Sequence, residues 1–132
     1  LFLKELDPEM VGIGPFIAHK DTPFCNERSG TLDDTLFYLA LLRLMLPNVL
    51  LPATTALGTI HPRGREMGVL SGANVVMPNL SPVSVRKKYM LYDGKICTGD
   101  EAAECRMCLS RRMERIGCEV VTDRGDYKKR LA

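Results

Sequence analysis

Three short apolar segments, separated by polar loops and one long apolar stretch, set the pattern of this sequence. They run from Met10 to Ile17, from Val49 to Leu51 and from Asn74 to Met77. None of them alternates strictly between apolar and polar residues, which is typical of parallel strands covered on both faces. Pro52 and Pro78 directly follow the second and third segments. We therefore expect three short buried strands, with proline ending the second and third.

Helices are predicted between these strands. Thr31 is a suitable N-cap for a helix that runs to about Leu46 and is apolar around most of its girth. Residues 58–64 are predicted to form a loop, and Arg65 to Ser71 a short helix with Gly72 at its C-terminal end. The resulting order of strand, helix, strand, helix, strand is typical of a parallel α/β fold.

The pattern changes after Pro82, where short helices over residues 85–91 and 101–116 and a short strand over 119–122 are predicted. Residues 1–82 are therefore expected to form the last strands and helices of a larger β/α domain, and residues 83–132 a small helical extension that bears cysteines. A barrel needs about eight strands, and three strands with two open edges leave apolar helices partly uncovered. We therefore expect the chain to be the last part of a larger domain that does not fold stably in isolation.

Composition and charge exclude several classes of partner. The chain has 132 residues, 45% of them hydrophobic and 26% charged, which is ordinary for a soluble domain. Its formal charge of +2 is too small to indicate a nucleic acid or a membrane surface as partner. No apolar run is long enough to cross a bilayer, and the first residues lack the apolar core of a signal peptide. A cytoplasmic location is expected.

The strongest chemical signal is a group of three cysteines, Cys97, Cys105 and Cys108. Cys105 and Cys108 lie three residues apart on one face of the predicted helix, and Cys97 precedes that helix closely enough to fold back toward them. Thiolates in this arrangement suit an iron–sulfur cluster or zinc. Three free thiols are the alternative. Cys25 and Cys118 are interpreted as bystanders.

The polar ends of the predicted strands form a second candidate site. Thr54 and Thr55 follow the second strand, and Met77 ends the third. The carboxyl ends of parallel strands meet at one mouth, where such folds bind ligands, and Tyr89 reaches the same mouth from the next short helix. The alternatives are that the threonines satisfy backbone groups in a bend and that Met77 and Tyr89 are packing residues. The lone histidines His19 and His61 have no assigned role.

Four segments of the sequence resemble a known family. MVGIGPFIAHKDTPF, LPATTALGTI, GREMGVLSGANVVMPNLSP and KKYMLYDGKIC are similar to the C-terminal half of the HydE family, the radical-SAM enzymes of [FeFe]-hydrogenase maturation. The resemblance extends from about Met10 to Cys108. Biotin synthase and methylornithine synthase are more distantly similar, so an enzyme of that group with an organic substrate is an alternative. A non-catalytic metal-binding module is an alternative of a different class.

The resemblance implies a radical-SAM β/α barrel of the TIM type, with residues 1–82 as its last strands and helices and with a closed internal cavity. In that cavity Thr54 and Thr55 meet the substrate or its anionic groups, Met77 meets S-adenosyl-L-methionine, and Tyr89 lines the wall. The implied substrate is a small organometallic one, an iron–cysteinate–carbonyl–cyanide precursor of the hydrogenase H-cluster. Other hydrogenase maturation proteins are the implied partners.

The resemblance also implies two clusters. A [4Fe-4S] cluster that cleaves S-adenosyl-L-methionine is held in this family by a CxxxCxxC motif. That motif does not occur in this chain, so the 132 residues alone are expected to be inactive. Cys97, Cys105 and Cys108 match an auxiliary [2Fe-2S] site near the protein surface, which is not universal in the family.

Overall fold

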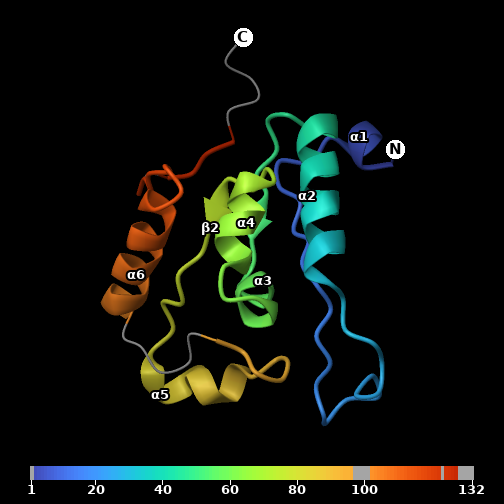
Figure 1. Cartoon of the computed structure of the whole chain (residues 1–132), viewed down its shortest axis with the longest axis vertical. Coiled ribbons are helices and arrows are strands. Elements are labelled where there is room, and N and C mark those ends of the chain that lie inside the picture. The colour runs from blue at the N-terminus through green and yellow to red at the C-terminus, as the bar shows by residue number, and fades with distance from the viewer. Residues whose placement is uncertain (1, 97–101, 123, 128–132) are drawn as a thin grey trace.

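The computed structural model describes residues 2–96, 102–122 and 124–127 and combines helices with short parallel strands (Figure 1). Its elements in chain order are α1 (Phe2–Leu6), α2 (Leu32–Met45), β1 (Pro52–Ala53), α3 (Thr55–Ile60), α4 (Gly64–Leu70), β2 (Val75–Val76), α5 (Val83–Arg86), the 3₁₀ turn η1 (Lys87–Tyr89) and α6 (Ala102–Glu114). Among the described residues, no helix combines the length and the apolar composition needed to cross a membrane.

Parallel pairing joins the three predicted strand segments. β1 pairs with β2 in the register Pro52 to Val75 and Ala53 to Val76. On the other side, Met10 forms a parallel bridge with Leu50. The predicted α/β character is thus confirmed for this part of the chain, while the closed barrel stays a prediction.

The strands are shorter than predicted, and two of them differ in detail. In the first segment only Met10 makes a strand-like bridge, and its side chain is 48% exposed, so the prediction of a buried strand over Met10 to Ile17 is wrong. Pro15 has no N–H to donate, and Gly12 and Gly14 are weak strand formers. The second strand begins at Pro52 instead of ending there. Proline is tolerated at the first residue of a strand because the N–H that it lacks is least needed there.

Helix replaces part of the loop predicted over residues 58–64, because α3 extends to Ile60 and α4 begins at Gly64, which leaves residues 61–63 as the loop. α3 begins directly after Thr54, whose hydroxyl accepts a hydrogen bond from the Leu57 N–H at 3.5 Å. This N-cap satisfies one of the donors that every helix leaves unpaired at its start. The short strand predicted over residues 119–122 is likewise absent from the structure.

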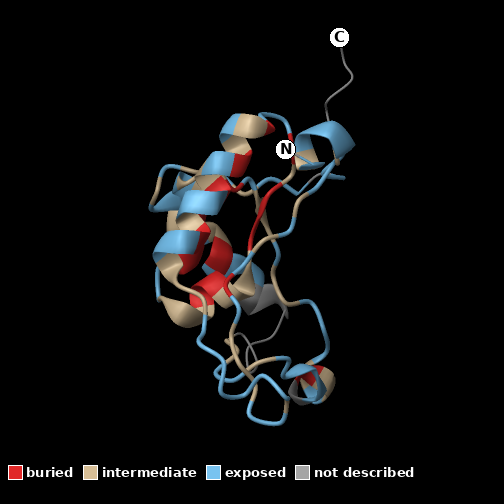
Figure 2. Cartoon of the chain, turned by 90° about the vertical axis from the view of Figure 1, so that its right-hand side faces the viewer, coloured by how far each residue is buried: buried red, intermediate tan, exposed pale blue. Residues whose placement is uncertain are grey.

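One face of α2 forms the core together with β1, α3 and the residues around them. The predicted N-cap is confirmed, because the Thr31 hydroxyl accepts a hydrogen bond from the Asp34 N–H. The largest apolar side chains buried here are Leu39, Leu51 and Leu57, and Figure 2 shows the buried positions along the inner side of α2 and the adjacent central segment. The outer face of α2 is uncovered, with Leu44 80% exposed.

Two glycines allow α4 to lie close to this core. A Cβ on Gly68 would come within 3.0 Å of the Leu57 side chain and 3.4 Å of the Ala53 side chain. Gly72 follows the helix with φ +120°, a conformation that favours glycine, which confirms the predicted end of this helix. α4 therefore packs against both α2 and β1.

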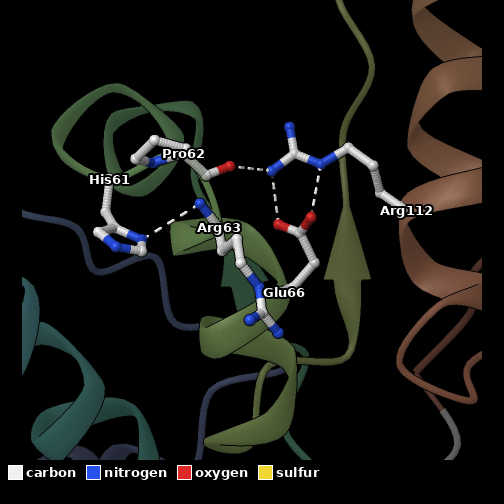
Figure 3. Close-up of polar contacts among 5 residues, drawn as sticks. All are labelled: His61, Pro62, Arg63, Glu66 and Arg112. Carbon is white, nitrogen blue, oxygen red and sulfur yellow. Dashed lines mark hydrogen bonds and ion pairs between the residues drawn. The ribbon is translucent and has the colours of Figure 1, made fainter.

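A bidentate ion pair fastens α6 to α4 (Figure 3). Arg112 of α6 donates through Nε to Glu66 Oε1 at 2.7 Å and through Nη2 to Glu66 Oε2 at 2.5 Å. The same Nη2 also donates to the Pro62 carbonyl oxygen. Leu109 and Met113, on the same helix, are each 2% exposed. The ion pair thereby holds the cysteine-bearing helix beside α4.

The pairing favours the ionised form of the Glu66 carboxyl. Burial alone would raise the pKa of Glu66, but the hydrogen bonds from Arg112 and from the backbone, with the charges of Arg112 and Arg65, bring the pKa below its ordinary value. A carboxyl with a lowered pKa in the folded state stabilises that state at pH values above its ordinary pKa. This stabilisation is lost as the pH falls through the lowered pKa.

We predict that Leu51→Ala destabilises the fold far more than Leu44→Ala. Leu51 is fully buried and Leu44 is largely exposed, so the first change opens a cavity and should cost roughly 2–5 kcal/mol of unfolding free energy, whereas the second should cost less than about 0.5 kcal/mol. Denaturant unfolding followed by circular dichroism, on protein expressed from the complete gene, measures both. Equal losses would contradict the burial described for these two leucines.

We predict that Glu66→Gln loosens α6 at neutral pH and much less in acid. Removing one partner of this mostly buried pair should cost roughly 2–3 kcal/mol in the free energy of opening α6, measured by amide hydrogen exchange in residues 106–114. The difference from wild type should shrink as the pH falls below about 4.3, the ordinary pKa of Glu. Asp126→Asn, at the exposed pair with Arg124, is the control and should change little. A difference that is independent of pH would contradict the role given to the Glu66 charge.

Candidate functional site

A cavity of about 230 Å³ opens between α3, α4, the residues after β2, and the segment that begins at α5. Its lining consists of Thr55, Arg65, Met77, Pro78, Asn79, Ser81, Arg86, Tyr89, Lys95 and Ile96. Three of the four residues proposed from sequence for the cavity, Thr55, Met77 and Tyr89, are therefore brought together. They come from the start of α3, the end of the β2 segment and η1.

The fourth residue, Thr54, lies beside this cavity and does not line it. Its hydroxyl caps α3, as described above, and its side chain closely approaches the first extended segment. A Cβ on Gly14 would come within 2.8 Å of Thr54 Oγ1, so Gly14 is a position where only glycine leaves room. In this structure the two neighbouring threonines thus have different surroundings, one at the cavity and one in the cap.

Three basic side chains line the cavity, and sequence reasoning missed all of them. They belong to Arg65, Arg86 and Lys95, and none of the ten lining residues is acidic. Arg65 and Arg86 are only 3% and 2% exposed. In the sequence these residues resemble ordinary helix-surface or turn residues. The available signal was their position, since Arg65 and Arg86 lie within a few residues of the predicted loops at the strand ends.

Hydrogen bonds orient two of these cations. Arg86 donates through Nε to the Ser81 carbonyl oxygen at 2.8 Å and through Nη2 to the Asn79 carbonyl oxygen at 3.2 Å, which fixes the loop between β2 and α5. Lys95 Nζ donates to the Tyr89 carbonyl oxygen at 2.8 Å. The carboxylate of Glu66 does not line the cavity. It pairs with Arg112 and also interacts electrostatically with Arg65.

The arrangement suits an anionic ligand. Guanidinium and ammonium groups form their strongest hydrogen bonds with anions, and burial increases the strength of these interactions relative to water. The Thr55 and Tyr89 side chains bring hydroxyl groups, and Met77 and Ile96 bring apolar surface. The volume is below the roughly 300–1,000 Å³ typical of ligand pockets, so these residues form the wall of a small site or one part of a larger one.

Neither histidine lies at the cavity. His19 Nδ1 accepts a hydrogen bond from the Asp21 N–H, and His61 Nδ1 accepts one from the Arg63 N–H, both at 3.1 Å. Each side chain thus closes a local turn, as Figure 3 shows for His61. These contacts give both residues a structural role.

The cysteine site lies partly outside the described residues. α6 includes positions 105 and 108, so the helix that was to present these two cysteines is confirmed. Cys108 is exposed, which leaves its thiol accessible as a ligand. Cys97 and the side chain of Cys105 lie outside the described residues, and within the described part of the chain no group of three His, Cys, Asp or Glu is placed to hold a metal. Cys25 is exposed and Cys118 is partly buried.

Comparison with known proteins gives an informative match. No family model matches the chain. The chain is 49% identical over 129 residues, 98% of its length, to the [FeFe] hydrogenase maturase subunit HydE of Thermotoga maritima. It spans 37% of the length of that relative and matches its C-terminal part. The resemblance inferred from the four sequence segments is therefore confirmed: almost the whole of this chain corresponds to the C-terminal part of a HydE-type maturase.

Proposed function

We propose that this chain is the C-terminal part of a radical S-adenosyl-L-methionine enzyme of the HydE type, which takes part in the maturation of [FeFe]-hydrogenase. The observation that carries the proposal is the 49% identity over nearly the whole chain. Identity at this level favours the maturase over the more distant biotin synthase group. In such an enzyme the chain supplies the last strands of a β/α barrel and part of the wall of its internal cavity.

The cavity described above supports an anionic substrate. An iron–cysteinate–carbonyl–cyanide complex carries negative charge and exposes carboxylate and cyanide groups. Arg65 and Lys95 would offset that charge, and the Thr55 hydroxyl would donate a hydrogen bond at the same place. Met77 and Tyr89 contribute wall surface where S-adenosyl-L-methionine would lie, and Thr54 supports Thr55 by capping α3.

The role of these residues is to bind and orient the substrate and to exclude water from the cavity. In the complete enzyme S-adenosyl-L-methionine and a [4Fe-4S] cluster supply the radical chemistry, and a CxxxCxxC motif that would hold this cluster does not occur in these 132 residues. We therefore propose that the 132 residues alone are inactive. A cavity with buried cations keeps a charged substrate in register because its dipoles and charges are in place before the substrate arrives.

The cysteines of α6 are proposed as an auxiliary [2Fe-2S] site. Cys105 and Cys108 belong to one helix and Cys108 is exposed, which fits a cluster near the surface, with Cys97 as third ligand. Thiolates are the donors that such clusters take in proteins.

We predict that Thr55→Val and Lys95→Met each reduce hydrogenase maturation strongly. Each change removes a polar group from the cavity at nearly constant volume, and loss of one hydrogen bond to a charged ligand corresponds to about 1.5–3 kcal/mol, or roughly 10-fold to 100-fold in affinity. The measurement is activation of [FeFe]-hydrogenase by protein expressed from the complete gene. Thr59→Val, on the same helix, and Lys88→Met, an exposed residue, are matched controls that should retain activation. Full activation by both cavity variants would refute the proposed role of the cavity.

We predict that the double variant Cys105→Ser, Cys108→Ser loses the auxiliary cluster. After anaerobic reconstitution of protein from the complete gene, the iron and sulfide in excess of one [4Fe-4S] cluster should disappear, because serine does not replace thiolate as a soft ligand. Cys25→Ser is the control and should keep the full content. An unchanged content of iron and sulfide in the double variant would refute the assignment of these cysteines.

A further inference from the structure

Three of the ten residues that line the cavity come from one short part of the chain, residues 89–96, which we call the wall segment. They are Tyr89, Lys95 and Ile96. The wall segment therefore supplies one of the three cations and one of the apolar surfaces of the site. Whatever holds this segment in place also determines the shape and the charge of the cavity.

Burial contributes little to holding the wall segment. Leu91 is 71% exposed and Tyr89 is also largely exposed. The hydrogen bond from Lys95 to the Tyr89 carbonyl joins the two ends of the segment to each other and not to the rest of the fold. One close contact reaches α3, since a Cβ on Gly58 would come within 2.8 Å of Ile96 Cδ1. Segments with few buried side chains open with low free energies and depend on the hydrogen bonds that remain.

Asp93 supplies hydrogen bonds that tie the wall segment to a distant part of the chain. Its N–H donates to the Ala18 carbonyl oxygen at 3.2 Å, and its Oδ2 accepts from the Lys20 N–H at 3.2 Å. The next residue, Gly94, has φ +70°, a conformation that favours glycine, and it forms a turn between Asp93 and Lys95. Figure 1 shows this segment, in yellow to orange, turning beneath α3 on the side that faces the loop before α2.

We propose that Asp93 is a positioning residue of the cavity. Its carboxylate does not line the site. It acts through the wall segment, because fastening residue 93 to residues 18–20 holds Lys95 and Ile96 against the cavity. The fastening itself is independent of any ligand, whereas its effect on binding rests on the proposed function of the cavity.

The fastening is tested first, without ligand, in protein expressed from the complete gene. In Asp93→Ala, amide hydrogen exchange in residues 89–96 should accelerate by roughly tenfold, the size expected for one hydrogen bond. Asp93→Asn should remain near wild type, because its side-chain oxygen still accepts from the Lys20 N–H. Asp21→Ala removes the same charge from the neighbouring loop and should also resemble wild type. Wild-type exchange in Asp93→Ala, or equal acceleration in Asp93→Asn, would overturn the proposal.

The effect on the site is tested with S-adenosyl-L-methionine as probe. Its dissociation rate constant should rise by roughly tenfold in Asp93→Ala and stay unchanged in Asp93→Asn and Asp21→Ala, because the wall opens more often. If Asp93→Ala accelerates exchange but leaves probe dissociation unchanged, Asp93 does not position the cavity and the proposal fails. If wild type does not bind the probe at all, the proposed function fails, while the exchange measurement still decides whether Asp93 fastens the segment.

Discussion

The backbone of Leu51 is the point on which the rest of the structure depends. Its carbonyl oxygen accepts hydrogen bonds from the N–H groups of Asn74 and Val75, at 2.9 and 3.1 Å, and its N–H donates to Asn74 Oδ1 at 2.8 Å. Pro52, the next residue, has no N–H to contribute. The side-chain amide of Asn74 therefore extends a ladder that the backbone alone makes only over two residues on each strand. This pairing places the start of α3 next to the end of β2, and with them the two sides of the cavity.

Local signals in the sequence were sufficient for elements whose ends and faces are well marked. α2 was predicted because an N-cap, a long apolar stretch and a following proline agree with one another. α3 was not, because its six residues include threonine, isoleucine and glycine, which are weak helix formers. A helix of this length is marginal by itself. It forms here because Thr54 caps it and Leu57 is fully buried, and neither fact is visible before the chain is folded.

The candidate site was predicted in part for a similar reason. Parallel topology and family resemblance were enough to place Thr55, Met77 and Tyr89 in one group, since strand ends converge whatever the details of packing. The cations were missed because arginine and lysine are mostly exposed in proteins, and a position near a predicted strand-end loop does not by itself distinguish a buried arginine from a solvated one. Arg86 is buried because the loop between β2 and α5 turns its carbonyl groups toward it. That turn is a property of the folded chain.

Arg65 and Glu66 are neighbours in sequence, but their side chains have different surroundings. Arg65 lines the cavity, and Glu66 forms an ion pair with Arg112 of α6. Successive residues on a helix are about 100° apart, so a single short rod presents both side chains in a fixed angular relation. α4 therefore connects the cavity, through Arg65, with the cysteine-bearing helix, through Glu66. A rotation of this helix that withdrew Glu66 from its partner would also swing the Arg65 guanidinium across the cavity wall, and neither side can be repositioned without the other.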